Sequence, residues 1–143
     1  SNGSASLTAS DNVVHVHNQP GQVGISGCFM RTEALFVTSG LDSVKVFDVS
    51  NPALPVELGA IHSAHFENEA MTCGERRTKK GVKRFALIGV DLYQLSEDPA
   101  HYNVGGNELV VVDVTDPFKP VMKSRLSLST GAHTVACVDP KLP

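Results

Sequence analysis

Residues 108–121 read ELVVVDVTDPFKPV, and residues 43–56 read SVKVFDVSNPALPV. Each segment runs from an apolar stretch into an aspartate and then into a turn that carries two prolines. Short runs rich in Val and bounded by Asn, Asp and Pro are typical of a β-strand that ends in a turn. The chain therefore contains the same strand and turn twice, at positions 44 and 109, an offset of 65 residues.

The similarity continues upstream of these segments, but at smaller offsets. EALFV at 33–37 matches FALIG at 85–89, an offset of 52, and Cys28 matches Cys73, an offset of 45. We infer a repeat unit of about 45 residues with insertions in the second copy. The insertions fall at 76–84 and 91–103.

Each copy is predicted to form four strands, because short segments rich in Val, Ile, Phe and Thr are separated by Gly, Pro, Asn and Asp. No window has the 3.6-residue apolar period of a helix. The strands of the first copy are expected at 23–30, 33–39, 43–49 and 55–61. Those of the second are expected at 68–75, 84–90, 108–114 and 120–128. The basic stretch RRTKKGVKR, residues 76–84, is predicted to be a solvated loop between two strands.

The third strand of each unit decides the fold class. In the second copy this strand is apolar on both faces, so both faces need cover, and without helices only other sheets can provide it. A repeated four-stranded unit stacked sheet on sheet is a β-propeller blade. The expected class is all-β, with blades of four antiparallel strands in an incomplete propeller. A two-sheet sandwich is the alternative, but it does not predict a repeated unit.

Five segments are expected along the chain. They are a leader at 1–11, of which the initial Ser-Asn resembles the remnant of a cleaved tag, strand D of a preceding blade at 12–18, one blade at 23–61, a blade with insertions at 68–128, and the first strand of a next blade at 132–139. A closed propeller typically has four to eight blades. The expected partners are therefore the remaining blades or a second copy of the chain.

Composition restricts the function classes. The 143 residues carry a net charge of −3 with both signs interspersed, which argues against a nucleic-acid partner. No apolar run approaches the roughly 20 residues of a membrane span. The three cysteines form no CxxC pair, so a zinc knuckle is not expected, and at least one thiol is free or pairs outside the chain. Their recurrence suggests a small buried side chain in the inner strand, at Cys28, Cys73 and Cys137.

Leu109-Val110-Val111-Val112-Asp113 resembles the LVIVD repeat of bacterial β-propeller proteins, and Val44-Lys45-Val46-Phe47-Asp48 is a weaker match. The resemblance covers about residues 12–139. It implies a propeller that is often exported or at the cell surface, and it implies no particular activity. The two aspartates, Asp48 and Asp113, are expected to accept hydrogen bonds from N–H groups of the following turn.

Polar residues are expected to gather where loops reach the mouth of the central channel. The loops are 62–69, 91–104 and 129–134, and the candidate ligand-binding residues are His65, Glu67, Glu69, Asp91, His101 and His133. Three of them, His65, Glu69 and His133, are the possible ligands of a divalent transition metal. The alternative is that these residues form no binding site and only make a polar rim that hydrates the entrance to the channel.

Two functions follow. The first is a non-catalytic binding module for a protein, glycan or small molecule, with no cofactor, supported by the lack of a recognised catalytic motif. The alternative is a metal-dependent hydrolase or oxidase at the channel mouth. The resemblance places the protein outside the cell or at its surface.

Overall fold

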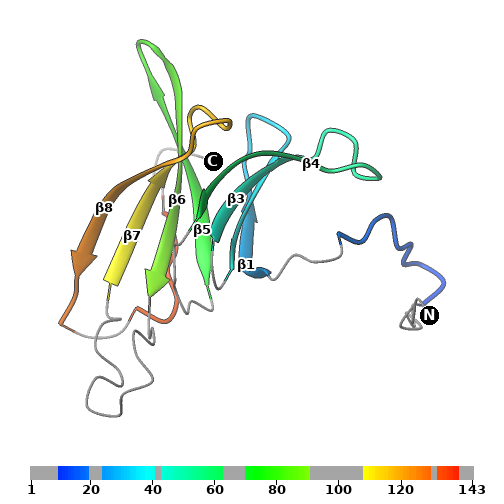
Figure 1. The fold of residues 1–143 in the computed structure, drawn as a ribbon, viewed down its shortest axis with the longest axis horizontal. Helices are drawn as coiled ribbons and strands as arrows, with labels where there is room; N and C mark the ends of the chain where they lie inside the picture. Colours follow the sequence, from blue (N-terminus) through cyan, green and yellow to red (C-terminus); the bar gives the residue numbers. More distant parts are fainter. Residues whose placement is uncertain are drawn as a thin grey trace.

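The computed structural model describes residues 10–19, 24–40, 43–62, 70–90, 108–129 and 132–138. In these residues all regular structure is β, and it forms two four-stranded antiparallel sheets with strand orders β1-β2-β3-β4 and β5-β6-β7-β8 (Figure 1). The strands are β1 Gly24–Phe29, β2 Leu35–Gly40, β3 Ser43–Asp48, β4 Val56–His62, β5 Met71–Thr78, β6 Gly81–Val90, β7 Glu108–Asp113 and β8 Val121–Ser127. The all-β class with four-stranded blades is confirmed; we call β1–β4 blade 1 and β5–β8 blade 2.

The two blades share the pairing of their second, third and fourth strands. Leu35 of β2 pairs with Asp48 of β3, and Phe85 of β6 pairs with Asp113 of β7. Each outer pair of strands also carries a register shift at the same place, between Val46 and Phe47 in β3 and between Val111 and Val112 in β7. Such bulges bend a strand and increase its twist. The sequence repeat therefore reflects a repeated three-dimensional unit.

The turn between the third and fourth strands explains why the quoted segments recur. The backbone N–H of Ser50 donates to Asp48 Oδ1 at 2.8 Å, and that of Thr115 donates to Asp113 Oδ1 at 2.9 Å. Asn51 and Asp116 each accept from the N–H two residues later, at 3.1 Å. The side chains thus satisfy turn N–H groups that have no ladder partner, which confirms the prediction for Asp48 and Asp113.

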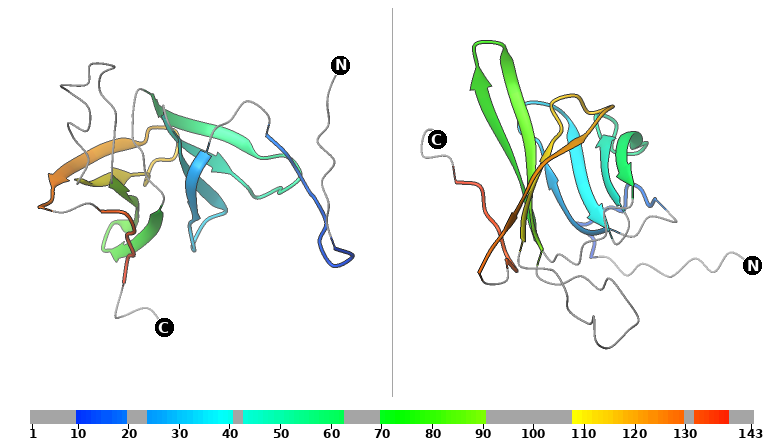
Figure 2. Two further views of the ribbon diagram at one scale, coloured as in Figure 1. Left: turned by 90° about the horizontal axis from the view of Figure 1, so that it is seen from below. Right: turned by 60° about the vertical axis from the view of Figure 1, so that its left-hand side comes forward.

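The blades stack face to face, and the core lies between them (Figure 2). Because side chains alternate along a strand, one face of each sheet supplies the buried residues. Blade 1 contributes Leu35, Val37, Val44 and Val46, and blade 2 contributes Ala86, Ile88, Val90, Val110 and Val112. This one shared core determines how the two sheets sit on one another.

The basic stretch at 76–84 differs from its prediction. It is a β-hairpin in which β5 continues to Thr78, Lys79 and Lys80 form the turn, and β6 begins at Gly81. Gly81 has a φ of 116°, a backbone conformation that glycine adopts without strain. The predicted exposure is confirmed for 76–81 and 83, but the predicted loop is wrong, because these residues pair with one another beyond the edge of the rest of the sheet.

Two described segments lie outside the sheets. Residues 10–19 form no sheet pairing in the structure and are largely exposed. Residues 132–138 lie against β6, where a Cβ added at Gly89 would collide with the backbone of Ala132. The assignment of 12–18 and 132–139 to neighbouring blades stays a prediction. In the described part of the chain, no helix is long and apolar enough to cross a membrane.

Candidate functional site

The predicted channel-mouth site falls mostly outside the described residues. This applies to His65, Glu67, Glu69, Asp91 and His101, so their proximity stays a prediction. His133 is described and is exposed, in the segment that lies against β6. Among the residues that the structure describes, no group of three or more His, Cys, Asp and Glu could hold a metal ion.

Two links between the blades stand out among the described residues, and the first is a disulfide. Cys28 of β1 and Cys73 of β5 form a disulfide, with their Cα atoms 5.5 Å apart and 45 residues between them in sequence. The bond joins the first strand of one blade to the first strand of the next. It therefore links two successive repeat units covalently.

A one-residue difference in register makes this bond possible. Leu35 and Phe85 are equivalent because they pair with the equivalent aspartates, so the residues that follow them, Phe36 and Ala86, are equivalent too. On the other side of the strand, Phe36 pairs with Phe29, whereas Ala86 pairs with Cys73. The counterpart of Cys73 in blade 1 is therefore Phe29, and Cys28 is one residue earlier. Successive strand residues point to opposite faces, so Cys28 points forward to blade 2 and Cys73 points back to blade 1.

The predicted recurrence of the cysteines at one place is thus wrong for Cys28. Identical positions in stacked, rotated blades would point the same way and could not meet across the junction. The offset of 45 between Cys28 and Cys73 in the sequence conceals this slip. The pairing of β1 with β2 is shifted by one residue relative to the pairing of β5 with β6. The remaining cysteine, Cys137, is free.

Cys137 packs on the other face of β5. Its sulfur lies 2.9 Å from the position of a Cβ added at Gly74, and Gly74 faces away from the side that Cys73 occupies. The strand therefore separates the free thiol from the disulfide. Within the described residues the cysteines form one bonded pair and one separate thiol.

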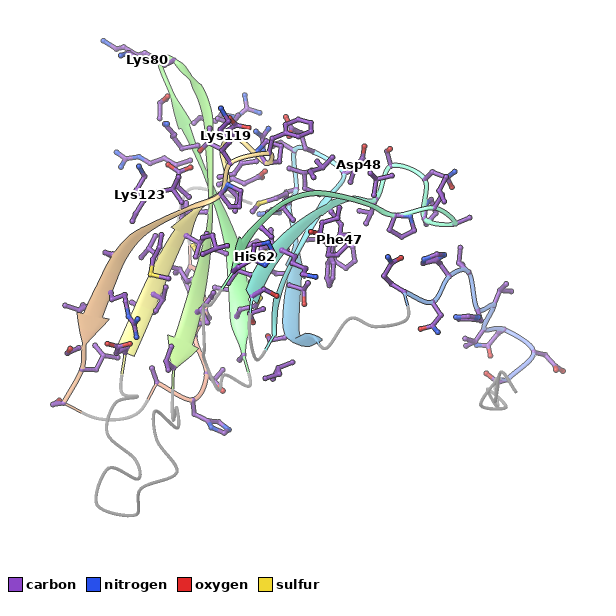
Figure 3. The ribbon with its side chains drawn as sticks, in the orientation of Figure 1. Phe47, Asp48, His62, Lys80, Lys119 and Lys123 are labelled. Carbon is purple, nitrogen blue, oxygen red and sulfur yellow. A yellow bond between two sulfur atoms is a disulfide. The ribbon has the colours of Figure 1, made fainter. Side chains whose placement is uncertain are left out.

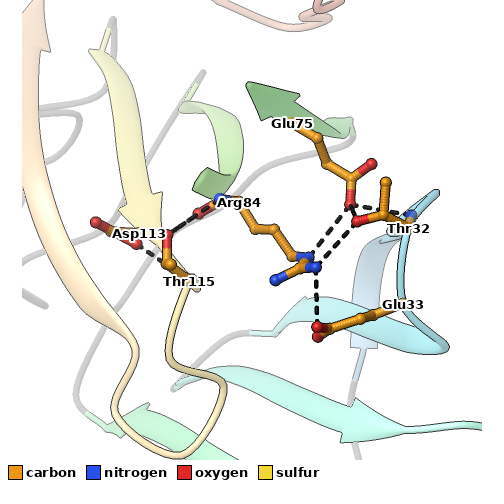
Figure 4. A network of polar contacts seen from close by, with 6 residues as sticks. All are labelled: Thr32, Glu33, Glu75, Arg84, Asp113 and Thr115. Carbon is orange, nitrogen blue, oxygen red and sulfur yellow. Dashed lines mark hydrogen bonds and ion pairs between the residues drawn. The ribbon is translucent and has the colours of Figure 1, made fainter. Parts of the chain in front are cut away.

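A buried arginine provides the second link across the junction (Figure 4). Arg84, on β6, places its Nη2 2.9 Å from Glu33 Oε1 and 3.0 Å from Thr32 Oγ1, both in the turn between β1 and β2. Glu75 of β5 completes the cluster and accepts hydrogen bonds from the Thr32 hydroxyl at 2.7 Å and the Thr32 N–H at 3.1 Å. We call these four residues the arginine clasp.

The clasp is well buried on the side of blade 2. The side chains of Arg84 and Glu75 are 10% and 7% exposed, whereas that of Glu33 is 47% exposed. Arg84 Nε lies 3.3 Å from Glu75 Oε1, close enough for an ion pair but without a hydrogen bond. Removing one partner of a buried pair is costly, because the other charge stays in a poorly solvated place.

A third contact closes the outer side of the junction. A Cβ added at Gly59 of β4 would lie 2.6 Å from the carbonyl oxygen of Pro117, in the turn between β7 and β8. Only glycine lets the two backbones approach this closely. Blade 2 therefore contacts blade 1 at the inner strands through the disulfide, in the middle through the core, and at the outer strand through this turn.

The pKa values of the two turn aspartates, Asp48 and Asp113, are both lowered by their surroundings. The Ser50 N–H and hydroxyl lower the pKa of Asp48 from its ordinary value of 3.8. Burial acts to raise the pKa of Asp113, but hydrogen bonds from Thr115 and the charges of Lys83 and Lys123 outweigh it, so the net effect is a lowered pKa. Both carboxylates are structural acceptors in turns.

Sequence reasoning missed the disulfide and the arginine clasp. Arg84 stands in the basic stretch, where it looks like one more solvated cation, and Glu33 and Glu75 have no distinguishing neighbours in the sequence. The one usable signal was that Cys28 and Cys73 are one repeat length apart. The disulfide and the arginine clasp join the two blades.

Comparison with known proteins agrees with the repeat read from the structure. The LVIVD repeat matches residues 35–62 and 95–127, which include β2 to β4 of blade 1 and β7 and β8 of blade 2. No curated protein and no solved structure matches the chain. LVIVD repeats are associated with β-propeller-like folds, in agreement with the two open sheets seen here. Two segments of the chain therefore match the LVIVD repeat.

Proposed function

We propose that the chain is a rigid, non-catalytic section of a β-propeller that binds a ligand through the loops at 62–69, 91–104 and 129–134. The observation that carries the proposal is the junction: a disulfide, an arginine clasp and a shared core hold two repeat units in one relative position. A rigid scaffold that positions surface loops is the usual architecture of a binding module. The ligand class is a protein, a glycan or a small molecule.

The disulfide also supports a compartment. Bonds of this kind persist in oxidising surroundings and are rare in a reducing cytosol. The proposed place of action is therefore outside the cell or at its surface. Mass spectrometry of alkylated protein isolated from its native source tests this, since two blocked thiols at Cys28 and Cys73 would contradict it.

Further blades or a second copy of the chain are the proposed structural partners. The face of blade 2 opposite the shared core carries the partly buried Leu87, Leu109 and Val111, and residues 132–138 already lie across part of it. Equivalent positions in blade 1, such as Val37 and Val46, are fully buried against blade 2. A next blade would bury the exposed face in the same way.

The binding function is tested with glycan and peptide arrays. Wild-type protein is compared with a variant in which residues 92–103 are replaced by a Gly-Ser linker of the same length. A ligand that is bound by the wild type and lost by the variant supports the loop rim as the site. A ligand that is retained by the variant contradicts it.

Metal analysis separates this proposal from the enzyme alternative. Stoichiometric transition metal in the purified protein, lost in His133→Ala while the fold is kept, would favour a metal-dependent hydrolase or oxidase. Metal-free protein with an intact fold would leave the binding module as the function. Circular dichroism checks the fold in both cases.

A further inference from the structure

The hairpin of β5 and β6 has a part that blade 1 lacks. In blade 1 the pairing of the first two strands ends with Phe29 and Phe36, followed by a hydrogen bond from Met30 to Leu35. In blade 2 the ladder continues for four more pairs, from Glu75–Arg84 to Thr78–Gly81. This extension projects beyond the rim of the sheet (Figure 1). We call residues 75–84 the cationic finger.

The finger concentrates positive charge in a chain that is acidic overall. Six of the 12 Lys and Arg residues of the chain lie in it, against one acidic residue, Glu75. Arg84 and Glu75 are part of the arginine clasp, which anchors the base of the finger. The other five cations are exposed and form no salt bridge with any described residue: Arg76, Arg77, Lys79, Lys80 and Lys83.

The arrangement of these charges opposes folding. Arg76 and Lys83 are directly paired across the two strands, and like charges at such positions destabilise a hairpin. The extension buries little apolar surface in return, since its tip residues are all exposed. A feature that weakens the hairpin it belongs to, and that the equivalent hairpin lacks, is better explained by binding than by stability.

The positive charge continues from the finger onto the flank of blade 2. Lys83 of β6 and Lys123 of β8 both act on Asp113 of β7, whose pKa they lower, and Lys119 and Lys123 belong to the turn before β8 and to β8 itself (Figure 3). Asp113 lies beside them, but Thr115 donates to its carboxylate. Blade 2 therefore carries cations both on the finger and at its β7–β8 side.

The finger also has backbone groups available for pairing. Arg84 donates its N–H to Thr115 and accepts at its carbonyl from Val114, so its backbone points outward from the hairpin. Backbone direction alternates along an antiparallel strand, so Val82 points outward on the same edge. No described strand covers that edge at Val82, because β7 pairs only with residues 85–90 of β6.

We propose that the cationic finger binds an acidic polypeptide segment in an extended conformation. Carboxylates along the segment would meet the exposed cations of the finger, and its backbone could pair with the edge at Val82, as in strand addition. The finger has no aromatic residue on which nucleic-acid bases could stack, which disfavours single strands. Its narrow tip presents few cations to a flat surface, which disfavours a membrane.

Fluorescence anisotropy with a labelled peptide of about twelve glutamates tests the proposal on the full chain. We expect Lys79→Gln/Lys80→Gln to weaken binding about fivefold, and the addition of Arg76→Gln and Lys83→Gln to weaken it about thirtyfold. Wild-type binding should fall steeply as salt rises from about 0.05 M to about 0.3 M. Circular dichroism checks that each variant is folded.

The matched control removes the same two charges elsewhere, as Arg31→Gln/Arg125→Gln, and should change affinity less than twofold. Equal weakening in the control and the finger variant would mean that only net charge matters, and would overturn the assignment. A neutral polyglutamine peptide that binds equally well would also overturn it. So would tighter binding of duplex DNA or of vesicles that contain phosphatidylserine. The loop-rim ligand should bind the finger variants normally, which keeps this test separate from that of the proposed function.

Discussion

Blade 1 and blade 2 share their turns and their bulges but differ in the face that each turns toward the preceding blade. In blade 2 this face carries Val110, which is fully buried against blade 1. The equivalent residue of blade 1 is Lys45, which forms an ion pair with Glu57 at 3.4 Å. Beside it lie the aromatic rings of Phe29 and Phe36, with centroids 4.7 Å apart. A repeat thus keeps its turn chemistry and adapts its faces to what covers them.

Exchanging these two residues should give the largest effect. Val110→Lys would bury an unpaired charge in the shared core, and we expect a loss of more than about 4 kcal/mol in unfolding free energy, enough to prevent folding. The reverse change, Lys45→Val, should alter stability by less than about 1 kcal/mol, because its side chain is partly exposed and its partner Glu57 more so. Urea denaturation measures both, and similar losses would mean that the faces do not differ as described.

Removing the disulfide tests how the two blades depend on each other. Cys28→Ser/Cys73→Ser should cost about 4 kcal/mol, since the bond closes a loop with a sequence separation of 45 residues. Thermal unfolding of the variant and of reduced wild type should agree. Cys137→Ser is the control and should leave the stability nearly unchanged. A variant as stable as the wild type would show that the core alone locks the junction.

Breaking the arginine clasp should cost somewhat less. Arg84→Met leaves the carboxylate of Glu75 buried without its cation, and we expect a loss of about 3 kcal/mol. Glu33→Gln should cost less than about 1 kcal/mol, because that side chain is half exposed. The double variant Arg84→Met/Glu75→Leu should recover much of the loss. If it is as unstable as Arg84→Met alone, the uncompensated charge is not the cause.

The smallest effects are expected at the two turn aspartates. Asp113→Ala should cost about 1 kcal/mol, since the Thr115 N–H loses its acceptor. Asp48→Ala, at a more exposed turn, should cost less. The folded pKa of both groups is below 3.8, so the unfolded chain binds protons first as the pH falls. Their contribution to the unfolding free energy is therefore complete above about pH 5 and declines below about pH 4. This decline should be absent from the pH profile of the variant Asp48→Ala/Asp113→Ala.

The cysteines and the basic stretch show how far sequence reasoning reached. The alignment found the repeat, and strand ends such as Asp48 and Asp113 were placed correctly because their turns depend on residues within a few positions of each other. The predicted match of 33–37 with 85–89 is wrong by two residues, because Leu35 and Phe85 pair with the equivalent Asp48 and Asp113. The stretch at 76–84 was misread because charge alone predicts exposure and says nothing about pairing. Arg84 shares that composition but is buried in the arginine clasp, two of whose members, Thr32 and Glu33, are more than 50 positions away in the sequence.

The sequence by itself determined the four-stranded unit, its turns and its repetition, because these arise from local propensities and short-range hydrogen bonds. Only the tertiary structure decided which faces meet and which charges are buried. The physical reason is the two-residue period of a strand: a slip of one residue in pairing reverses the direction of a side chain. That slip brings Cys28 and Cys73 together, and no alignment of the two repeats could show it.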